Sequence, residues 1–105
     1  MIDVVYTFKP NPGKRNDGVE LLKKLIALNK KVSPGMGCRV LTPTTGYYNK
    51  VYMVLTYESH QQREEHDAKI RATPEWDAIL KEVREKDLWV SGDRETHIHK
   101  VEALL

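Results

Sequence analysis

The chain has 105 residues, 40% of them hydrophobic and 30% charged, and this length predicts a single domain over residues 1–105. Its longest hydrophobic run, residues 51–55, is far shorter than the roughly 20 residues of a membrane helix, so we expect neither a membrane partner nor a signal peptide. The single cysteine, Cys38, excludes an internal disulfide and favours a reducing, cytoplasmic location.

Charge is unevenly distributed along the chain, although the formal net charge is only +2. Residues 1–52 hold nine Lys and Arg against three Asp and Glu, whereas residues 53–105 hold eight against twelve. Such asymmetry can mark a nucleic-acid-binding region, but no aromatic residues interleave with the basic ones. We favour two amphipathic helices of opposite charge that lie side by side, and we expect no nucleic-acid partner.

The beginning of the chain predicts a strand followed by a helix. Residues 2–8 alternate between apolar and other side chains, which is typical of a strand. Asp17 matches a helix N-cap with Glu20 as its capping-box partner, and an apolar stripe of leucines at helical spacing follows. The Ser-Pro-Gly sequence at residues 33–35 predicts the end of this helix.

A β-hairpin is expected next. Residues 36–42 predict a weak strand, residues 43–46 a turn, and residues 47–57 a second strand. That second strand carries apolar or aromatic side chains on both faces, with the odd-numbered residues on one face and Tyr52 and Val54 on the other.

The second half predicts a helix that is interrupted once. Ser59 and Gln62 form a capping box, and the first part of the helix is polar and expected to be poorly buried. Thr73 then caps a restart with Pro74 at its first position. A strong apolar face follows, and Trp76 is its expected core anchor.

The order of elements predicts the fold class. Residues 91–93 predict a turn and residues 94–102 a last strand, which completes a β-α-β-β-α-β order. This is the ferredoxin-like plan, an α+β fold with a four-stranded antiparallel sheet, both helices on one face, and the first and third strands central. A homodimer formed back to back would bury the apolar side chains on the other face, namely Val5, Leu41, Tyr52 and Val54.

Several short motifs resemble those of the NIPSNAP family. Residues 46–51 are similar to the family's Gly-x-x-Asn-x-Val start of the third strand, and residues 57–59 with residues 63–64 resemble its strand end and helix start. Residues 73–76 resemble its Pro-x-Trp step, and residues 12–14 resemble its first loop. The resemblance implies a dimeric α/β barrel, in the superfamily that also holds cofactor-free monooxygenases, haem-degrading enzymes and stress-response barrels.

Two histidines are candidates for acid–base chemistry. His97 and His99 are two residues apart on a predicted strand, so both point to one face, as catalytic or metal-ligating imidazoles can. The alternative is a polar face of an edge strand. No third ligand or known metal motif accompanies them, so we expect no metal site.

Four polar side chains are candidates for lining a ligand cavity, which would be mostly apolar with a few directed polar groups. They are Tyr6, Arg39, Asn49 and Tyr52. Alternatively, the two tyrosines are core or interface aromatics, and Asn49 bonds to the backbone of its own turn. Cys38 is expected to be a small buried hydrophobic residue.

No cofactor is predicted. His60 and His66 lie six residues apart on a predicted helix, so they do not share a face, and each is expected on the surface. Haem is the one cofactor that we considered, with His66 as its proximal ligand, but the signature of a haem pocket is absent.

Two classes of function remain open. The first is a dimeric barrel that binds a small, largely apolar or aromatic molecule and carries out cofactor-free oxygenase, isomerase or cyclase chemistry. The second is a non-catalytic binding module or stress-associated interaction module with the same fold. The two classes differ in whether His97, His99, Arg39 and Tyr52 converge on one closed cavity.

Overall fold

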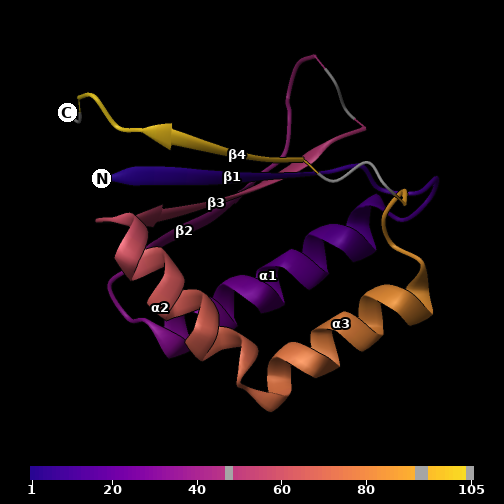
Figure 1. The fold of residues 1–105 in the computed structure, drawn as a ribbon. Coiled ribbons are helices and arrows are strands. Elements are labelled where there is room, and N and C mark those ends of the chain that lie inside the picture. Colours follow the sequence, from indigo (N-terminus) through magenta and orange to yellow (C-terminus); the bar gives the residue numbers. More distant parts are fainter. Residues whose placement is uncertain (47–48, 92–94, 104–105) are drawn as a thin grey trace.

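The computed structural model describes residues 1–46, 49–91 and 95–103, and it shows a sheet covered on one side by helices (Figure 1). The predicted α+β fold and the predicted order of elements are confirmed, with the second helix divided into two. Residues 47–48 of the predicted hairpin, residues 92–93 of the predicted turn and Arg94 of the predicted last strand lie outside the described residues.

The sheet has four antiparallel strands in the order β2-β3-β1-β4. The central strands are β1 (Ile2–Phe8) and β3 (Val51–Tyr57), as predicted for the first and third strands. The edges are β2 (Gly37–Leu41) and β4 (Glu95–Lys100). Because β3 begins at Val51, the prediction that put Asn49 on this strand is wrong, and Asn49 lies in the preceding turn.

Three helices, α1 (Arg15–Val32), α2 (His60–Arg71) and α3 (Pro74–Lys86), cover one face of the sheet (Figure 1). The predicted cap at Asp17 is wrong, because α1 begins two residues earlier and Lys14 occupies the N-cap position without a side-chain hydrogen bond. Asp17 lies instead in the first turn, where its negative charge complements the helix dipole.

The two predicted caps of the second helical region are confirmed. The Ser59 hydroxyl accepts a hydrogen bond of 3.2 Å from the Gln62 backbone N–H at the start of α2. The Thr73 hydroxyl accepts one of 3.3 Å from the Trp76 N–H at the start of α3, where Pro74 is the first helical residue. Each of these local hydrogen bonds therefore fixes the start of a helix.

The core lies between the sheet and the helices. The odd-numbered residues of β3 and the even-numbered residues of β1 face the helices, and Val4 and Val51 have no exposed surface. On the opposite, outer face, Val54 is only 4% exposed although no helix covers it, whereas Leu41 is 42% exposed. The apolar residues of the outer face are therefore partly shielded within the single chain.

Oppositely charged side chains join α1 to α3. Lys24 of α1 lies 2.9 Å from Glu82 of α3, and Lys31 lies 3.3 Å from Glu75. The predicted side-by-side packing of a basic and an acidic helix is therefore confirmed. None of the helices in the described residues is long and apolar enough to cross a membrane.

The third helix packs on α1 and α2, and it begins far from the sheet and approaches the sheet towards its C-terminal end (Figure 1). None of its residues is fully buried, and Trp76, the expected core anchor, packs on the core while staying partly exposed. By contrast, the predicted poor burial of α2 is wrong at His66 and Ile70, which are buried. Trp76 and other side chains of α3 thus line a cavity between this helix and the sheet.

Candidate functional site

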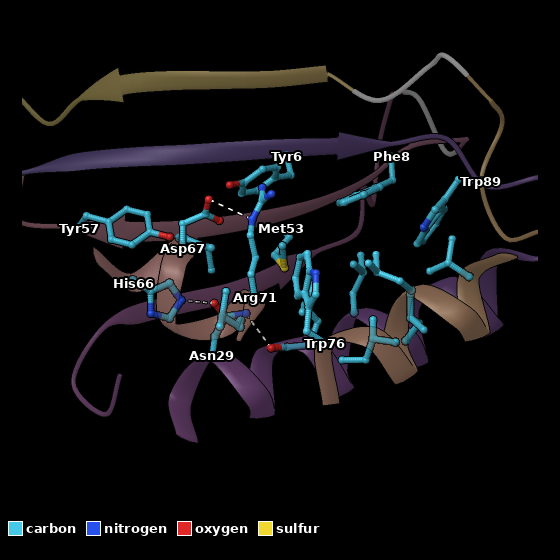
Figure 2. A pocket seen from close by; sticks show the side chains of 18 residues that line it. Tyr6, Phe8, Asn29, Met53, Tyr57, His66, Asp67, Arg71, Trp76 and Trp89 are labelled. Atoms are coloured by element: carbon cyan, nitrogen blue, oxygen red, sulfur yellow. Dashed lines mark hydrogen bonds and ion pairs between the residues drawn. The ribbon is translucent and has the colours of Figure 1, made fainter. Parts of the chain in front are cut away.

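A cavity of about 180 Å³ occupies the space between the sheet and the helices (Figure 2). Its lining comes from all three helices, from the two central strands and from Trp89. The walls are mostly apolar, and they include Leu21, Leu22, Leu25, Met53, Ile79 and Val83. A space of this kind suits a small apolar molecule.

Two aromatic residues in contact form one end of the cavity, with their rings tilted by 33°. The ring centroids of Phe8 and Trp89 are 4.9 Å apart, and Figure 2 places both rings at the same end. The Asn11 side-chain amide holds the loop that carries Trp89, because it donates hydrogen bonds to the carbonyl oxygens of Asp87, at 2.8 Å, and Trp89, at 3.1 Å. The indole also lies directly against Gly18 of α1.

Polar side chains gather at the other end of the cavity. Asp67 and Arg71 project from α2 towards Tyr6, with Tyr57 beyond them (Figure 2). The Arg71 Nε atom lies 3.1 Å from Asp67 Oδ2, and the guanidinium carbon lies 5.9 Å from the centre of the Trp76 ring. The cavity therefore has an apolar aromatic end and a polar end.

His66 lies at the polar end, but both of its ring nitrogens are already bonded. Its Nε2 lies 2.7 Å from Asn29 Oδ1, and its Nδ1 lies 2.7 Å from the Ser33 hydroxyl. The Asn29 amide nitrogen donates to the Leu25 carbonyl oxygen at 2.7 Å, so Asn29 Oδ1 accepts the proton of Nε2 and Nδ1 accepts the serine proton. Burial lowers the pKa of His66, which favours this neutral form.

The prediction that His66 lies on the surface is therefore wrong, because the residue is 3% exposed, whereas His60 is exposed as predicted. Its burial follows from contacts between α2 and the C-terminal end of α1, where Asn29 and Ser33 lie. Haem ligation by His66 would require the loss of one of these two hydrogen bonds. The geometry assigns this histidine to joining two helices.

Tyr57 is the buried hydroxyl donor of the cavity. It is 2% exposed, and burial is the main effect that raises the pKa of its phenol, with a further contribution from Tyr6. The phenol therefore stays protonated at neutral pH. It can donate a hydrogen bond to a ligand but does not act as a base.

His97 and His99 lie away from the cavity. Both are exposed on the outer face of β4, with ring centroids 6.4 Å apart, and His97 Nε2 lies 3.3 Å from Glu95 Oε2. Ile98 between them points to the helix side, in register with Val4. Over the described ranges, no three ligand-type side chains are placed to hold a metal ion.

The four predicted cavity residues do not come together. Tyr6 lines the cavity, whereas Tyr52 lies on the outer face and Asn49 in the exposed turn before β3. Arg39 borders a separate hollow at the end of the sheet, together with Asp3. Arg39 and Tyr52 thus share the outer face with the two histidines of β4.

Sequence reasoning missed the residues of the polar end, namely Tyr57, Asp67 and Arg71. A signal for the two charged ones was present, because Arg63, Asp67 and Arg71 recur every four residues and so lie on one face of a helix. Their charge suggested a solvated face. In the structure, Asp67 and Arg71 on this face line the cavity between the helices and the sheet.

Comparisons with known proteins agree on one family. The profile of the NIPSNAP family matches residues 4–99. A NIPSNAP domain protein from Burkholderia xenovorans is similar at 16% identity and a TM-score of 0.80, over 100% of this chain and 98% of its own. A NIPSNAP family protein of unknown function from Agrobacterium tumefaciens is similar at 20% identity and a TM-score of 0.78, over 96% and 87%.

A more distant similarity extends to another group of proteins. A Deinococcus radiodurans protein assigned as an antibiotic biosynthesis monooxygenase is 9% identical, with a TM-score of 0.71 over 100% of this chain and 96% of its own. No curated protein matched the sequence. At such identities the solved structures establish the fold alone. The family profile, however, spans nearly the whole chain, and this chain belongs to the NIPSNAP family.

Proposed function

We propose that this chain binds one small, largely apolar or aromatic molecule in the cavity between its sheet and its helices. The observation that carries the proposal is the division of the cavity into an apolar wall and one polar end. Arg71 and Leu80, which line this cavity of about 180 Å³, are exposed, so a ligand can reach it from solvent. For scale, an engineered apolar cavity of about 150 Å³ binds benzene.

Any chemistry in this cavity would use the groups at its polar end. Cofactor-free oxygenase, isomerase or cyclase reactions need a hydrogen-bond donor for a developing oxyanion and a base. Tyr57 could supply the donor and Asp67 the base. His97 and His99, the acid–base pair expected from sequence, lie on the outer face of β4, where they cannot reach a ligand in this cavity.

Non-catalytic binding is the second candidate function. It is favoured by the state of His66, whose two ring nitrogens both have hydrogen-bond partners within the protein. A histidine bonded in this way stabilises the walls of a binding site without exchanging protons with a ligand. A non-catalytic binding module or a stress-associated interaction module would therefore keep His66 neutral and in its two hydrogen bonds.

We also propose that two copies pair through their outer sheet faces, in a cytoplasmic homodimer. Leu41 is exposed on that face, and Val5 and Tyr52 are only half-buried, so pairing would remove apolar surface from water. Two-fold pairing is also the most common form of homo-oligomer.

Ligand binding is tested with a cavity-filling variant. Phenylacetamide is titrated into the protein while the indole N–H signals of its two tryptophans are followed in ¹H–¹⁵N spectra. We expect both signals to shift in the wild type and in Ala78→Phe, whose substitution lies on the exposed side of α3. Ile79→Phe, which fills the cavity, should abolish the shifts. Equal shifts in Ile79→Phe and in the wild type would refute the proposed site.

A further inference from the structure

Three charged residues of α2 form a stripe along one side of the helix. Arg63, Asp67 and Arg71 are spaced by four residues, which places them one above another. Asp67 and Arg71 line the cavity, and the buried residues His66 and Ile70 lie on the same side of α2. Asp67 and Arg71 therefore bring one negative and one positive charge to the polar end, and Arg63 lies one helical turn earlier on the same side of α2.

The positive charge of the stripe is not balanced. Asp67 lies 3.1 Å from the Nε atom of Arg71, an arrangement that leaves the terminal amino groups of that guanidinium for other acceptors. The Nε atom of Arg63 is buried and has no hydrogen-bond partner within the described part of the chain. Arg63 also stands in the first turn of α2, which contains no acidic residue and where the helix dipole disfavours a cation.

The neighbours of the stripe include a further hydrogen-bond donor. The protonated hydroxyl of Tyr57 lies near both Arg63 and Asp67: after the dominant effect of burial, the arginine lowers its pKa and the aspartate raises it. His66 is neutral and fully bonded. The unpaired Nε of Arg63 is a donor that a water molecule or an anion can satisfy.

We propose that the ligand of this cavity is an organic acid, with an apolar or aromatic body and one carboxylate. The body lies against Phe8 and Trp89 at the apolar end, and the carboxylate accepts hydrogen bonds from Arg71 and Tyr57 at the other end (Figure 2). Charge-assisted hydrogen bonds from a guanidinium to a carboxylate are short and can be bidentate. Arg63 supplies the second positive charge. This inference rests on the proposed function.

The test compares three probes of nearly equal shape and different charge. Phenylacetate is an anion, phenylacetamide is neutral and phenethylamine is a cation. Each is titrated into the protein at pH 7.5 while the two tryptophan indole signals are followed. We expect phenylacetate to bind at least roughly tenfold more tightly than phenylacetamide, which corresponds to about 1.4 kcal/mol, and phenethylamine to bind more weakly than both.

Two variants of α2, each of which removes one positive charge, test which residue causes the preference for phenylacetate over phenylacetamide. Arg71→Gln and Lys69→Gln each remove one exposed positive charge from α2, but only Arg71 lines the cavity. We expect Arg71→Gln to reduce the preference for phenylacetate over phenylacetamide to about twofold or less, and Lys69→Gln to retain it. Arg63→Gln should reduce the preference in part, while phenylacetamide affinity stays unchanged.

The outcomes separate the two proposals. Equal affinity for all three probes would refute the anionic ligand while leaving the binding cavity in place. Equal loss of preference in Arg71→Gln and Lys69→Gln would also refute it, because the selectivity would then come from net charge. Failure of every probe to shift either indole signal would overturn the proposed function and this inference with it.

Discussion

Gly18 lets the indole of Trp89 lie directly against the backbone of α1. A β-carbon built at Gly18 would be 2.5 Å from Cη2 and 2.6 Å from Cζ3 of Trp89, closer than such atoms can approach. The same indole packs against the ring of Phe8 at the apolar end of the cavity. The absence of one side chain on α1 therefore sets the position of the cavity wall.

Gly18→Ala is expected to destabilise the protein, although glycine-to-alanine changes inside a helix usually stabilise by roughly 0.5–1 kcal/mol. The added methyl group must displace Trp89, and overpacking of this kind costs about 1–3 kcal/mol. Urea unfolding measures the difference. Adding Trp89→Leu should make Gly18→Ala neutral or stabilising in the double variant. A more stable single variant would contradict the packing described here.

Protonation of His66 should reduce stability in acid. The pKa of His66 in the folded protein is lowered by burial from its ordinary 6.5, so below that pH the unfolded chain binds a proton that the folded chain does not. The free energy of unfolding should therefore fall as the pH drops below 6.5, by at most about 1.4 kcal/mol per pH unit. Urea unfolding between pH 7.5 and 5.5 measures this slope.

The control for this slope is a second histidine of the same helix. His60→Gln removes an exposed imidazole and should leave the slope unchanged. His66→Gln should remove most of it, whatever its effect on stability at pH 7.5. If the His66→Gln variant kept the wild-type slope, the dependence of stability on pH would come from groups other than His66.

Tyr52→Asp should weaken the proposed homodimer. It places a carboxylate in the middle of the outer sheet face, where pairing would bury it without a partner. The dimer dissociation constant should rise at least roughly tenfold, a change of about 1.4 kcal/mol. Sedimentation velocity measures it, with Ala68→Asp on the exposed side of α2 as the control. An unchanged sedimentation coefficient would exclude this interface.

Glu82 should contribute more to stability than an ordinary surface carboxylate. It lies 2.9 Å from Lys24 of α1 and 3.1 Å from Lys86, and hydrogen bonds from these two lysines lower the pKa of its carboxyl group. We expect Glu82→Gln to cost about 0.5–1 kcal/mol in urea unfolding at low salt, and less in 1 M NaCl.

Glu85→Gln is the matched control, because Glu85 pairs with the neighbouring Lys81 at 3.7 Å, within α3 itself. This change should be close to neutral. If Glu85→Gln lost as much stability as Glu82→Gln, the loss at Glu82 would not come from its ion pair with Lys24.

The features that sequence predicted well depend on residues close together in the chain. The caps at Ser59 and Thr73 each need one hydroxyl and one backbone N–H three residues later, so the pattern is complete within four residues. The faces of β3 follow from simple alternation. The start of α1 was misplaced because its N-cap, Lys14, makes no side-chain hydrogen bond that a motif could reveal.

The cavity depends on contacts between distant segments, which sequence patterns do not encode. His66 became a buried residue only through Asn29 and Ser33, more than thirty positions earlier in the chain. Trp89 reaches the cavity through the loop held by Asn11, nearly eighty positions away. The spacing of His97 and His99 on one strand predicted an acid–base pair. Spacing does not show, however, whether a cavity lies beside that face of the sheet.

The break between α2 and α3 separates the shape of the site from its chemistry. The donors of the polar end belong to α2 and β3, whereas α3 contributes apolar wall and stands off from the sheet after the bend at Thr73 and Pro74. A change of the bend would alter the length of molecule that fits without altering how its polar group is bound. Members of this family could thus evolve new ligand sizes through residues that never touch a ligand.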